Sequence, residues 1–298
     1  MKTYHFEPKI DVAVRSRDQL GETPLWCDRQ QALLWIDIEK PKLHSFHPAT
    51  GAHSTSEVEC DWLGSQALCE DGRRLIAKDL SLYLYDDLTD KWTLFVSLEA
   101  GLDNRLNDGR VDAQGRLWIG TMDNQLYRPN GALYRVLGDG SVMKFAEDVI
   151  VSNGIAISPD GKRLHFTDTR RYISWGYDLD PIDGVVTKKR VFAEYCQSGE
   201  RTDGACFDAD GCLWTAFFAG GKVVRYTPSG AIDKVIQLPL TNPTCVCFGG
   251  PDYKTLYVTT ASKFLNEDQL SREPLAGAVL AIEGVGQGLP ENRFVVNA

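Results

Sequence analysis

Short runs in which apolar and polar residues alternate, separated by tight turns, recur along the whole chain. Residues 106–121 show the pattern once: a strand-like run ends at Asp112, a turn follows at Gln114 and Gly115, and a second run rich in bulky apolar residues begins. Alternation with a period of two predicts strands with one buried face, and the glycine turn predicts a hairpin. Comparable hairpins cover residues 25–37, 67–77, 156–167, 206–215 and 251–259.

The hairpins return at a nearly constant distance. The leucine that opens the second strand of each one falls at Leu34, Leu75, Leu117, Leu164, Leu213 and Leu256, so the steps are 41, 42, 47, 49 and 43 residues. Each hairpin is followed by a second one, for example residues 132–136 with 142–146. A repeat of this length made of four strands is typical of a propeller blade. The sequence therefore predicts an all-β, six-bladed β-propeller with four-stranded blades, and a single domain over residues 1–298.

The two ends of the chain bear on how such a ring closes. Residues 10–16 alternate as a strand does but have no partner before them, so we expect this strand to complete the last blade and remove a sheet edge. The last repeat runs from residues 278–282 through Gly284 and Gly286 toward residues 293–296, which we expect to form its second hairpin. Two long irregular segments, 122–131 and 261–277, are expected at a functional mouth.

A polar residue stands near the start of the first strand in every repeat, where a propeller lines one end of its channel. The residues are Glu22, Ser65, Asn107, Asn153, Asp203 and Asn242. All carry a side-chain oxygen and two are carboxylates, which would repel one another unless a cation lay between them. Oxygen ligands suit Ca²⁺, Mg²⁺ or Mn²⁺. The alternative is that these side chains only cap turns or bind water.

Five motifs together resemble the regucalcin/gluconolactonase family, which includes the senescence marker protein and sugar lactonases. They are Gly-Glu-Thr-Pro-Leu-Trp at 21–26, Arg-Leu-Asn-Asp-Gly-Arg-Val-Asp at 105–112, Gly-Thr-Met at 120–122, Ser-Asn-Gly-Ile-Ala-Ile-Ser-Pro-Asp at 152–160 and Thr-Asp-Gly at 202–204. The resemblance runs from about residue 20 to residue 257 with the motifs in order. It implies a six-bladed propeller with one divalent metal ion, and a carboxylic-ester hydrolase of the gluconolactonase type that opens sugar lactones.

Carried over by position, the resemblance assigns roles to six residues. Glu22, Asn153 and Asp203 would hold the metal ion, which would be Ca, Zn, Mn, Mg or Fe, and Asp203 would also act as general acid and base. The substrate would be contacted by Arg105, Asn107 and Gln125. Gln125 stands where animal members carry a glutamate, so the identity of the sugar does not transfer.

Other interpretations of these positions stay open. Arg105 would alternatively form a surface ion pair with Asp103 or Asp108. The same metal site would also serve a phosphotriester hydrolase, and a non-catalytic, calcium-binding propeller is a third possibility. The pair of Arg105 and Asn107 favours a polyhydroxylated substrate over a hydrophobic phosphoester.

Bulk properties exclude several classes of protein. The formal net charge is −9, which argues against a nucleic-acid partner because such proteins present a basic face. No apolar run approaches the roughly 20 residues that span a bilayer, and the first nine residues lack the apolar core of a secretory signal. We therefore expect a cytoplasmic protein without membrane contact, a monomer or weak homo-oligomer, with its eight cysteines as free thiols. His44, His47 and His53 are expected on a solvated strand face.

Overall fold

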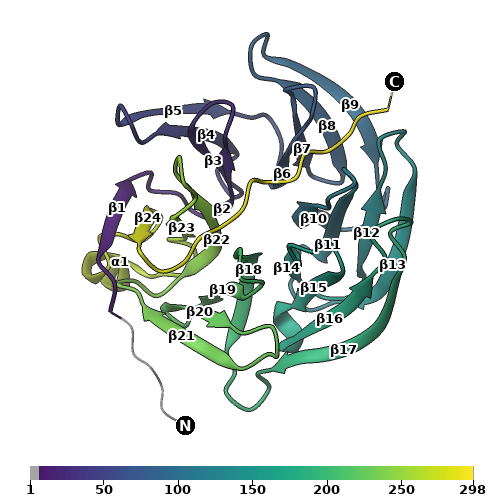
Figure 1. The fold of residues 1–298 in the computed structure, drawn as a ribbon. Helices are drawn as coiled ribbons and strands as arrows, with labels where there is room; N and C mark the ends of the chain where they lie inside the picture. Colours follow the sequence, from purple (N-terminus) through teal and green to yellow (C-terminus); the bar gives the residue numbers. More distant parts are fainter. Residues whose placement is uncertain (1–6, 298) are drawn as a thin grey trace. The chain divides into compact units, whose positions relative to one another are not determined.

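The structure, a computed structural model, describes residues 7–297 and consists almost entirely of antiparallel strands (Figure 1). Residues 1–6, part of the segment expected to lack a secretory signal, lie outside the described residues. The strands form six sheets of four, which confirms the predicted fold class of a six-bladed β-propeller. The chain divides into two compact units of three sheets each. That all 298 residues act as one domain stays a prediction.

The first unit comprises residues 7–58 and 197–290. Its first sheet contains β2 (Gly21–Cys27), β3 (Ala32–Asp37), β4 (Lys42–His47) and β5 (Ala52–Glu57). Its second contains β18 (Arg201–Phe207), β19 (Leu213–Phe218), β20 (Lys222–Tyr226) and β21 (Ile232–Gln237). Its third contains β22 (Pro243–Gly249), β23 (Thr255–Thr260), β24 (Val279–Glu283) and β1 (Ile10–Val14). A helix, α1 (Glu267–Arg272), lies between β23 and β24, and β22 packs beside both β2 and β18.

The second unit comprises residues 59–196 and 291–297. Its first sheet contains β6 (Leu63–Leu68), β7 (Arg74–Lys78), β8 (Ser81–Asp86) and β9 (Lys91–Ser97). Its second contains β10 (Asn104–Val111), β11 (Leu117–Asp123), β12 (Gly131–Val136) and β13 (Val142–Val149). Its third contains β14 (Ser152–Ile157), β15 (Arg163–Asp168), β16 (Ile173–Leu179) and β17 (Val186–Glu194), with a 3₁₀ turn, η1 (Thr169–Arg171), before β16. The first strand of the middle sheet, β10, packs beside β6 and β14.

The N-terminal strand completes the last blade, as the sequence predicts. Strand β1 pairs antiparallel with β24, with Ile10 opposite Ile282 and Val12 opposite Leu280 (Figure 1). Val14 is buried against Trp26 and Tyr257, so the strand contributes apolar surface as well as ladder hydrogen bonds. The edge that β24 would otherwise expose is thereby covered.

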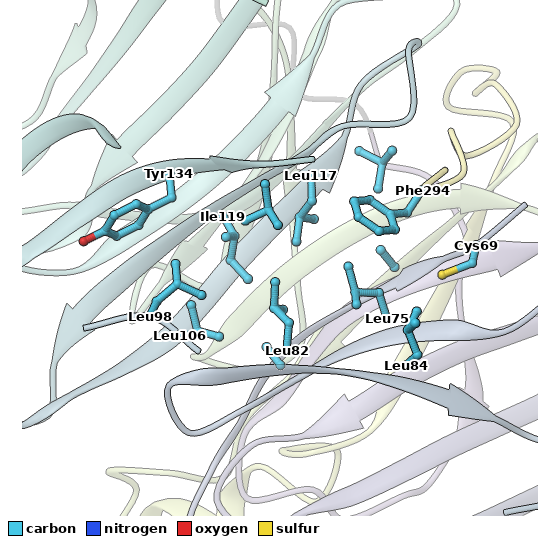
Figure 2. Packing of buried hydrophobic residues seen from close by; sticks show 14 of the residues in the cluster. Cys69, Leu75, Leu82, Leu84, Leu98, Leu106, Leu117, Ile119, Tyr134 and Phe294 are labelled. Carbon is cyan, nitrogen blue, oxygen red and sulfur yellow. The ribbon is translucent and has the colours of Figure 1, made fainter. Parts of the chain in front are cut away.

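The expected hairpin strand at residues 293–296 is wrong. Strand β1 already occupies the free edge of β24, so no edge is left for the C-terminal residues. They run instead along the second unit, where the Phe294 amide donates to Leu68 O at 2.7 Å and Phe294 O accepts from the Glu70 amide at 3.0 Å. Figure 2 shows the fully buried Phe294 ring among Leu75, Leu117 and Cys69. The buried Phe294 ring and these backbone hydrogen bonds together fasten the C-terminal residues to the core formed by β7 and β11.

Within the blades, a repeated Asp–Trp pair explains part of the repeat's consensus. Trp118 Nε1 donates to Asp112 Oδ2 at 3.0 Å, and Trp214 Nε1 donates to Asp208 Oδ2 at 2.8 Å. Both carboxylates also accept backbone amides of their own hairpin turn. The buried indole thus has a hydrogen-bond partner and the tight turn has a cap, which is why the aspartate precedes the tryptophan by six residues in both hairpins.

His44 is buried rather than solvated, which corrects the sequence-based expectation. Its ring stacks on Trp35 with centroids 4.6 Å apart, its Nε2 lies 3.3 Å from Asp18 Oδ1, and its Nδ1 lies 3.1 Å from His53 Nε2. The cause is that Trp35 and Asp18 pack against the imidazole and cover it. These contacts are structural and involve none of the proposed metal ligands.

Two further expectations bear on the protein's surroundings. In the described part of the chain, none of the helices has the length and apolar character needed to cross a membrane. All eight cysteines are free thiols, and six of them are buried. A cytoplasmic location stays a prediction.

Candidate functional site

Each blade's first strand departs from regular pairing near the polar residue that the sequence singled out. The register shifts lie between Glu22 and Leu25, Leu63 and Gln66, Leu106 and Gly109, Asn153 and Ala156, Thr202 and Ala205, and Pro243 and Cys245. An extra residue in one strand rotates the side chains around it, and such irregularities occur next to active sites because they re-aim side chains. Five of the six predicted polar residues lie at these positions.

The last blade is the exception. Thr244, and not Asn242, lies in its irregular stretch. Asn242 precedes β22 and donates to Lys263 O at 3.0 Å, so it anchors the segment that follows β23. Thr244 Oγ1 donates to Gly21 O at 2.5 Å, which ties β22 to the residue before Glu22.

Two of the predicted metal ligands, Glu22 and Asp203, belong to the first unit, where their strands β2 and β18 lie on either side of β22. Both side chains are buried, with exposed fractions of 7% each. Glu22 Oε2 accepts the amide of Thr23 at 2.7 Å, and Thr23 has a positive φ of 43°. The unusual backbone at Thr23 is the local cause of the break in pairing after Glu22.

The glycine of the Thr-Asp-Gly motif, Gly204, allows the strand that carries Asp203 to pack closely against β22. A Cβ added at Gly204 would come within 2.2 Å of Cys245 Sγ. Only glycine allows β18 and β22 to approach this closely. The close packing at Gly204 fixes the backbone next to Asp203 and so limits where its carboxylate can lie.

The third predicted ligand, Asn153, belongs to the second unit, and its amide orientation is fixed by two partners. Its Oδ1 accepts from Asn107 Nδ2 at 2.8 Å, and its Nδ2 donates to Thr169 Oγ1 at 2.9 Å. Asn107 Nδ2 also donates to Ser152 O at 2.8 Å. An amide oxygen has two lone pairs, so Asn153 Oδ1 retains acceptor capacity for a cation beyond its bond with Asn107.

Arg105 and Asn107 lie on β10 beside Asn153, and both are buried. Arg105 Nη2 contacts Met122 Sδ at 3.2 Å, which gives the methionine of the Gly-Thr-Met motif a role in orienting the guanidinium. The alternative of a surface ion pair with Asp103 or Asp108 does not fit the positions of these residues, because Arg105 is 6% exposed, Asp108 is 4% exposed, and Asp103 pairs with Arg128 at 2.6 Å.

The glycine of the same motif makes room for the residue before Asn153. A Cβ at Gly120 would lie 1.5 Å from Ser152 Oγ and 2.3 Å from Ser152 Cβ. We expect Gly120→Ala to displace β14, to lower the free energy of unfolding by about 1–3 kcal/mol as other overpacked sites do, and to lower activity through Asn153. Chemical denaturation and steady-state kinetics measure the two effects.

The matched control for this variant is the double exchange Gly120→Ala/Ser152→Gly. It removes the clashing atoms of residue 152 and should recover most of the stability and activity. A double variant as impaired as Gly120→Ala would show that the contact with Ser152 is not the cause.

The segment that carries Gln125 is fastened at its base by a buried carboxylate. Asp123 accepts from the backbone amides of Tyr127 at 3.0 Å and Arg128 at 2.7 Å, and from the Arg128 guanidinium. Burial opposes ionisation of Asp123, but these hydrogen bonds outweigh it and lower its pKa to about 2. Gln125 itself is exposed and donates to Asp103 Oδ2 at 3.2 Å. Its predicted contact with substrate stays a prediction.

Asp108 is a buried carboxyl group of the same motif, which the sequence analysis considered only as a possible ion-pair partner of Arg105. Its Oδ2 accepts the amide of Ile155 at 2.7 Å, which joins β10 to β14 two residues beyond Asn153. Burial raises its pKa to about 6, against the opposing influence of Arg110 and the backbone amides. Its position next to Asn107 was the available signal.

The raised pKa of Asp108 gives a pH-dependent stability. The folded protein holds the proton of the Asp108 carboxyl group more tightly than the unfolded chain does. The stability that this protonation contributes is therefore fully present below about pH 4 and is lost as pH rises through about 6. Asp108→Asn keeps the acceptor oxygen but cannot ionise. We expect its free energy of unfolding, relative to that of the parent protein, to increase by about 2 kcal/mol as pH rises from about 4.5 to about 8. Urea unfolding at the two pH values measures this difference.

Asp139→Asn is the control for the pH experiment. Asp139 is exposed and its pKa is lowered by the amide and hydroxyl of Ser141, so removing its charge should act in the opposite direction. A stability difference between Asp108→Asn and the parent that does not change with pH would contradict the prediction.

The donor set fits an oxygen-ligated divalent ion. It comprises two buried carboxylates and an amide whose oxygen is oriented by its neighbours. Among residues 7–297, no group of three or more His, Cys, Asp or Glu side chains is arranged to hold a metal ion. The predicted set contributes only Glu22 and Asp203 to such a group, because its third member is an asparagine.

Comparison with known proteins gives consistent matches over nearly the whole chain. The family described as the SMP-30/Gluconolactonase/LRE-like region matches residues 20–262. The chain is 39% identical over 287 residues to 6-deoxy-6-sulfogluconolactonase of Pseudomonas putida, covering 96% of this chain and 98% of that protein. It is 34% identical over 295 residues to regucalcin of Xenopus laevis, with coverage of 96% and 98%. A crystal structure of regucalcin from Agrobacterium tumefaciens, described as a calcium-binding protein, matches with a TM-score of 0.92 and 32% identity over 99% of this chain and 100% of that one.

Proposed function

Since the chain belongs to the SMP-30/gluconolactonase/LRE-like family, we propose that it is a metal-dependent lactonase that opens a sugar lactone to the sugar acid. Membership confirms the resemblance inferred from the motifs. The coarse class, a lactone-hydrolysing carboxylic-ester hydrolase, has the support of the family match and of the lactonase among the relatives. The metal, the residue roles and the sugar are the finer parts of the proposal.

The observation that carries the residue assignment is the fixed amide of Asn153. Asn107 and Thr169 hold it from both sides, so its oxygen is presented as an acceptor beside β10, the strand that also carries the buried Arg105. Supporting hydrogen bonds of this kind are characteristic of ligand residues, because they set the direction of the ligating atom in advance. A residue that only capped a turn would not need partners on both ends of its amide.

In the proposed site, Glu22, Asn153 and Asp203 would hold the ion. When bound, a divalent ion supplies Lewis acidity, which polarises the lactone carbonyl and favours ionisation of a nearby water. Asp203 takes a proton from the attacking water as its oxygen bonds to the carbonyl carbon. The bond from that carbon to the ring oxygen then breaks, and Asp203 returns the proton to the ring oxygen. Arg105 stabilises the negative charge that develops on the carbonyl oxygen.

The chain's remaining residues at the site act on orientation. Asn107 uses one amide hydrogen for Asn153 and another for Ser152 O, so its own oxygen is directed away from both and can accept from a sugar hydroxyl. Gln125 is neutral, so it would accept or donate a hydrogen bond to a sugar without favouring a positively or negatively charged substituent. We therefore expect Asn107 and the exposed Gln125 to influence which sugar is bound, and Glu22, Asn153 and Asp203 to determine the type of reaction.

A screen of aldonic-acid lactones by pH-stat titration tests the proposal. The protein is chelated, each lactone is assayed, and Ca²⁺, Zn²⁺, Mn²⁺, Mg²⁺ or Fe²⁺ is added back in turn, with spontaneous hydrolysis subtracted. We expect turnover that disappears on chelation and returns with at least one ion. Hydrolysis of phosphotriesters but of no lactone would instead support the phosphotriesterase alternative. Metal binding with no turnover of either class would support a calcium-binding propeller.

A further inference from the structure

Arg170 lies between the segment that carries Gln125, a proposed substrate contact, and Thr169, which holds the proposed metal ligand Asn153. It belongs to η1, which directly follows β15 and is capped by the buried carboxylate of Asp168. The residue before it, Thr169, is the partner that holds the Asn153 amide at 2.9 Å. The backbone of Arg170 is therefore fixed one residue from the anchor of a proposed metal ligand.

The side chain of Arg170 reaches the segment that carries Gln125. Its Nε donates to Leu126 O at 3.0 Å. Leu126 has a positive φ of 64°, an unusual conformation for a leucine, and its amide donates to Asp123 O at 3.0 Å. The Arg170 side chain therefore links two parts of the second unit. Its backbone is next to Thr169, which holds Asn153, and its Nε is bonded to Leu126, which follows Gln125.

Charge distinguishes Arg170 from the arginines around it. Arg128 is neutralised by Asp103 and Asp123, and Arg171 pairs with Asp168 at 3.3 Å. Arg170 is half-buried, and among residues 7–297 its terminal nitrogens have neither an ion-pair partner nor a hydrogen-bond acceptor. A half-buried guanidinium without a carboxylate favours an anionic acceptor, and its planar fork suits the paired oxygens of a sulfonate, carboxylate or phosphate.

We propose that Arg170 binds an oxyanion substituent at the end of the sugar lactone remote from the reacting carbonyl. This inference rests on the proposed lactonase function and specifies the substrate class: lactones that carry a negative charge. Its chemistry is shared by sulfonate, phosphate and carboxylate groups. Gln125 is consistent with this preference, because a carboxylate in its place would repel such a substrate.

Kinetics on a matched panel test the role of Arg170. The panel contains gluconolactone, its 6-sulfo and 6-phospho derivatives, and glucaric acid lactone, whose terminal group is a carboxylate. Arg170→Gln should lower kcat/KM for at least one anionic lactone by about 10- to 100-fold, while changing that for gluconolactone by no more than about 3-fold. The three anionic arms show which oxyanion is preferred. Arg171→Gln, one residue away, is the matched control and should leave the ranking unchanged.

A binding measurement separates this inference from the proposed function. Calorimetric titration with 6-phosphogluconate, 6-sulfogluconate, glucarate and gluconate requires no turnover. We expect tighter binding of at least one of the three acids with a second anionic group than of gluconate, and loss of that preference in Arg170→Gln. An equal loss for neutral and anionic lactones would overturn the proposal, because Arg170 would then only hold Leu126. Absence of lactone turnover with the preference intact would overturn the lactonase function and leave an anion-binding site.

Discussion

Replacing Asp203 by Asn is expected to lower kcat/KM for the preferred lactone by about 10²- to 10⁴-fold, the usual contribution of a general acid–base group. Asparagine keeps the shape of the side chain and one oxygen that can contact an ion, but it cannot take a proton from water at neutral pH. The loss should therefore fall on kcat, while metal affinity measured by calorimetry falls far less. Pre-steady-state measurement of acid release shows whether the chemical step is the one that slows.

The matched control for Asp203 lies on the same sheet. Asp210 is an exposed carboxylate in the turn between β18 and β19 and pairs with Arg225 at 2.9 Å. Asp210→Asn should keep the activity of the parent protein. If Asp203→Asn also keeps it, Asp203 is not the proton acceptor, and another group must take that role.

Removing the N-terminal strand is expected to have the largest effect on stability. A chain that begins at residue 17 lacks β1, so the amides and carbonyls of β24 lose their partners and the side chains beneath Val14 become exposed. We expect a melting temperature lower by many degrees, or insoluble protein, because an uncovered apolar sheet edge pairs readily with other chains. Thermal unfolding followed by circular dichroism, together with light scattering, measures both outcomes.

Two point variants make the test independent of truncation. Val14→Asp places a charge among Trp26, Tyr257 and Val279 and should reproduce much of the loss. Asp11→Ala changes an exposed residue of the same strand and should have little effect. A truncated chain that melts like the parent protein would show that the last blade is stable with three strands.

The sequence alone was sufficient for the architecture because the fold is a repeat. Each blade needs the same alternation of apolar residues and the same turn, so the pattern at Leu117 is repeated at Leu213 and can be counted. The pairing of residues 10–14 with the last blade was also predictable, since a strand without a local partner must find a distant one. The family followed from motifs such as residues 105–112.

Local pattern failed where a residue's partner lies far along the chain. Residues 293–296 look like a blade strand, but β1 had already taken the available edge and Phe294 is buried against β7 and β11 instead. His44 sits on an ordinary alternating strand, and only Asp18 and Trp35 make it a buried residue. Neither partner can be identified from spacing.

The candidate site divides in the same way. Residue type and position in the repeat singled out six polar residues, and the resemblance to the family selected Glu22, Asn153 and Asp203 among them as proposed metal ligands. The tertiary structure decided how those side chains are held: the amide of Asn153 is oriented by Asn107 and Thr169, and Gly120 leaves space for Ser152. Arg170 carries no motif and becomes noticeable only through its contact with Leu126 and its lack of a carboxylate partner within residues 7–297. Periodicity specifies which face of a strand a residue occupies, whereas the packing of neighbouring strands determines which atoms it meets there.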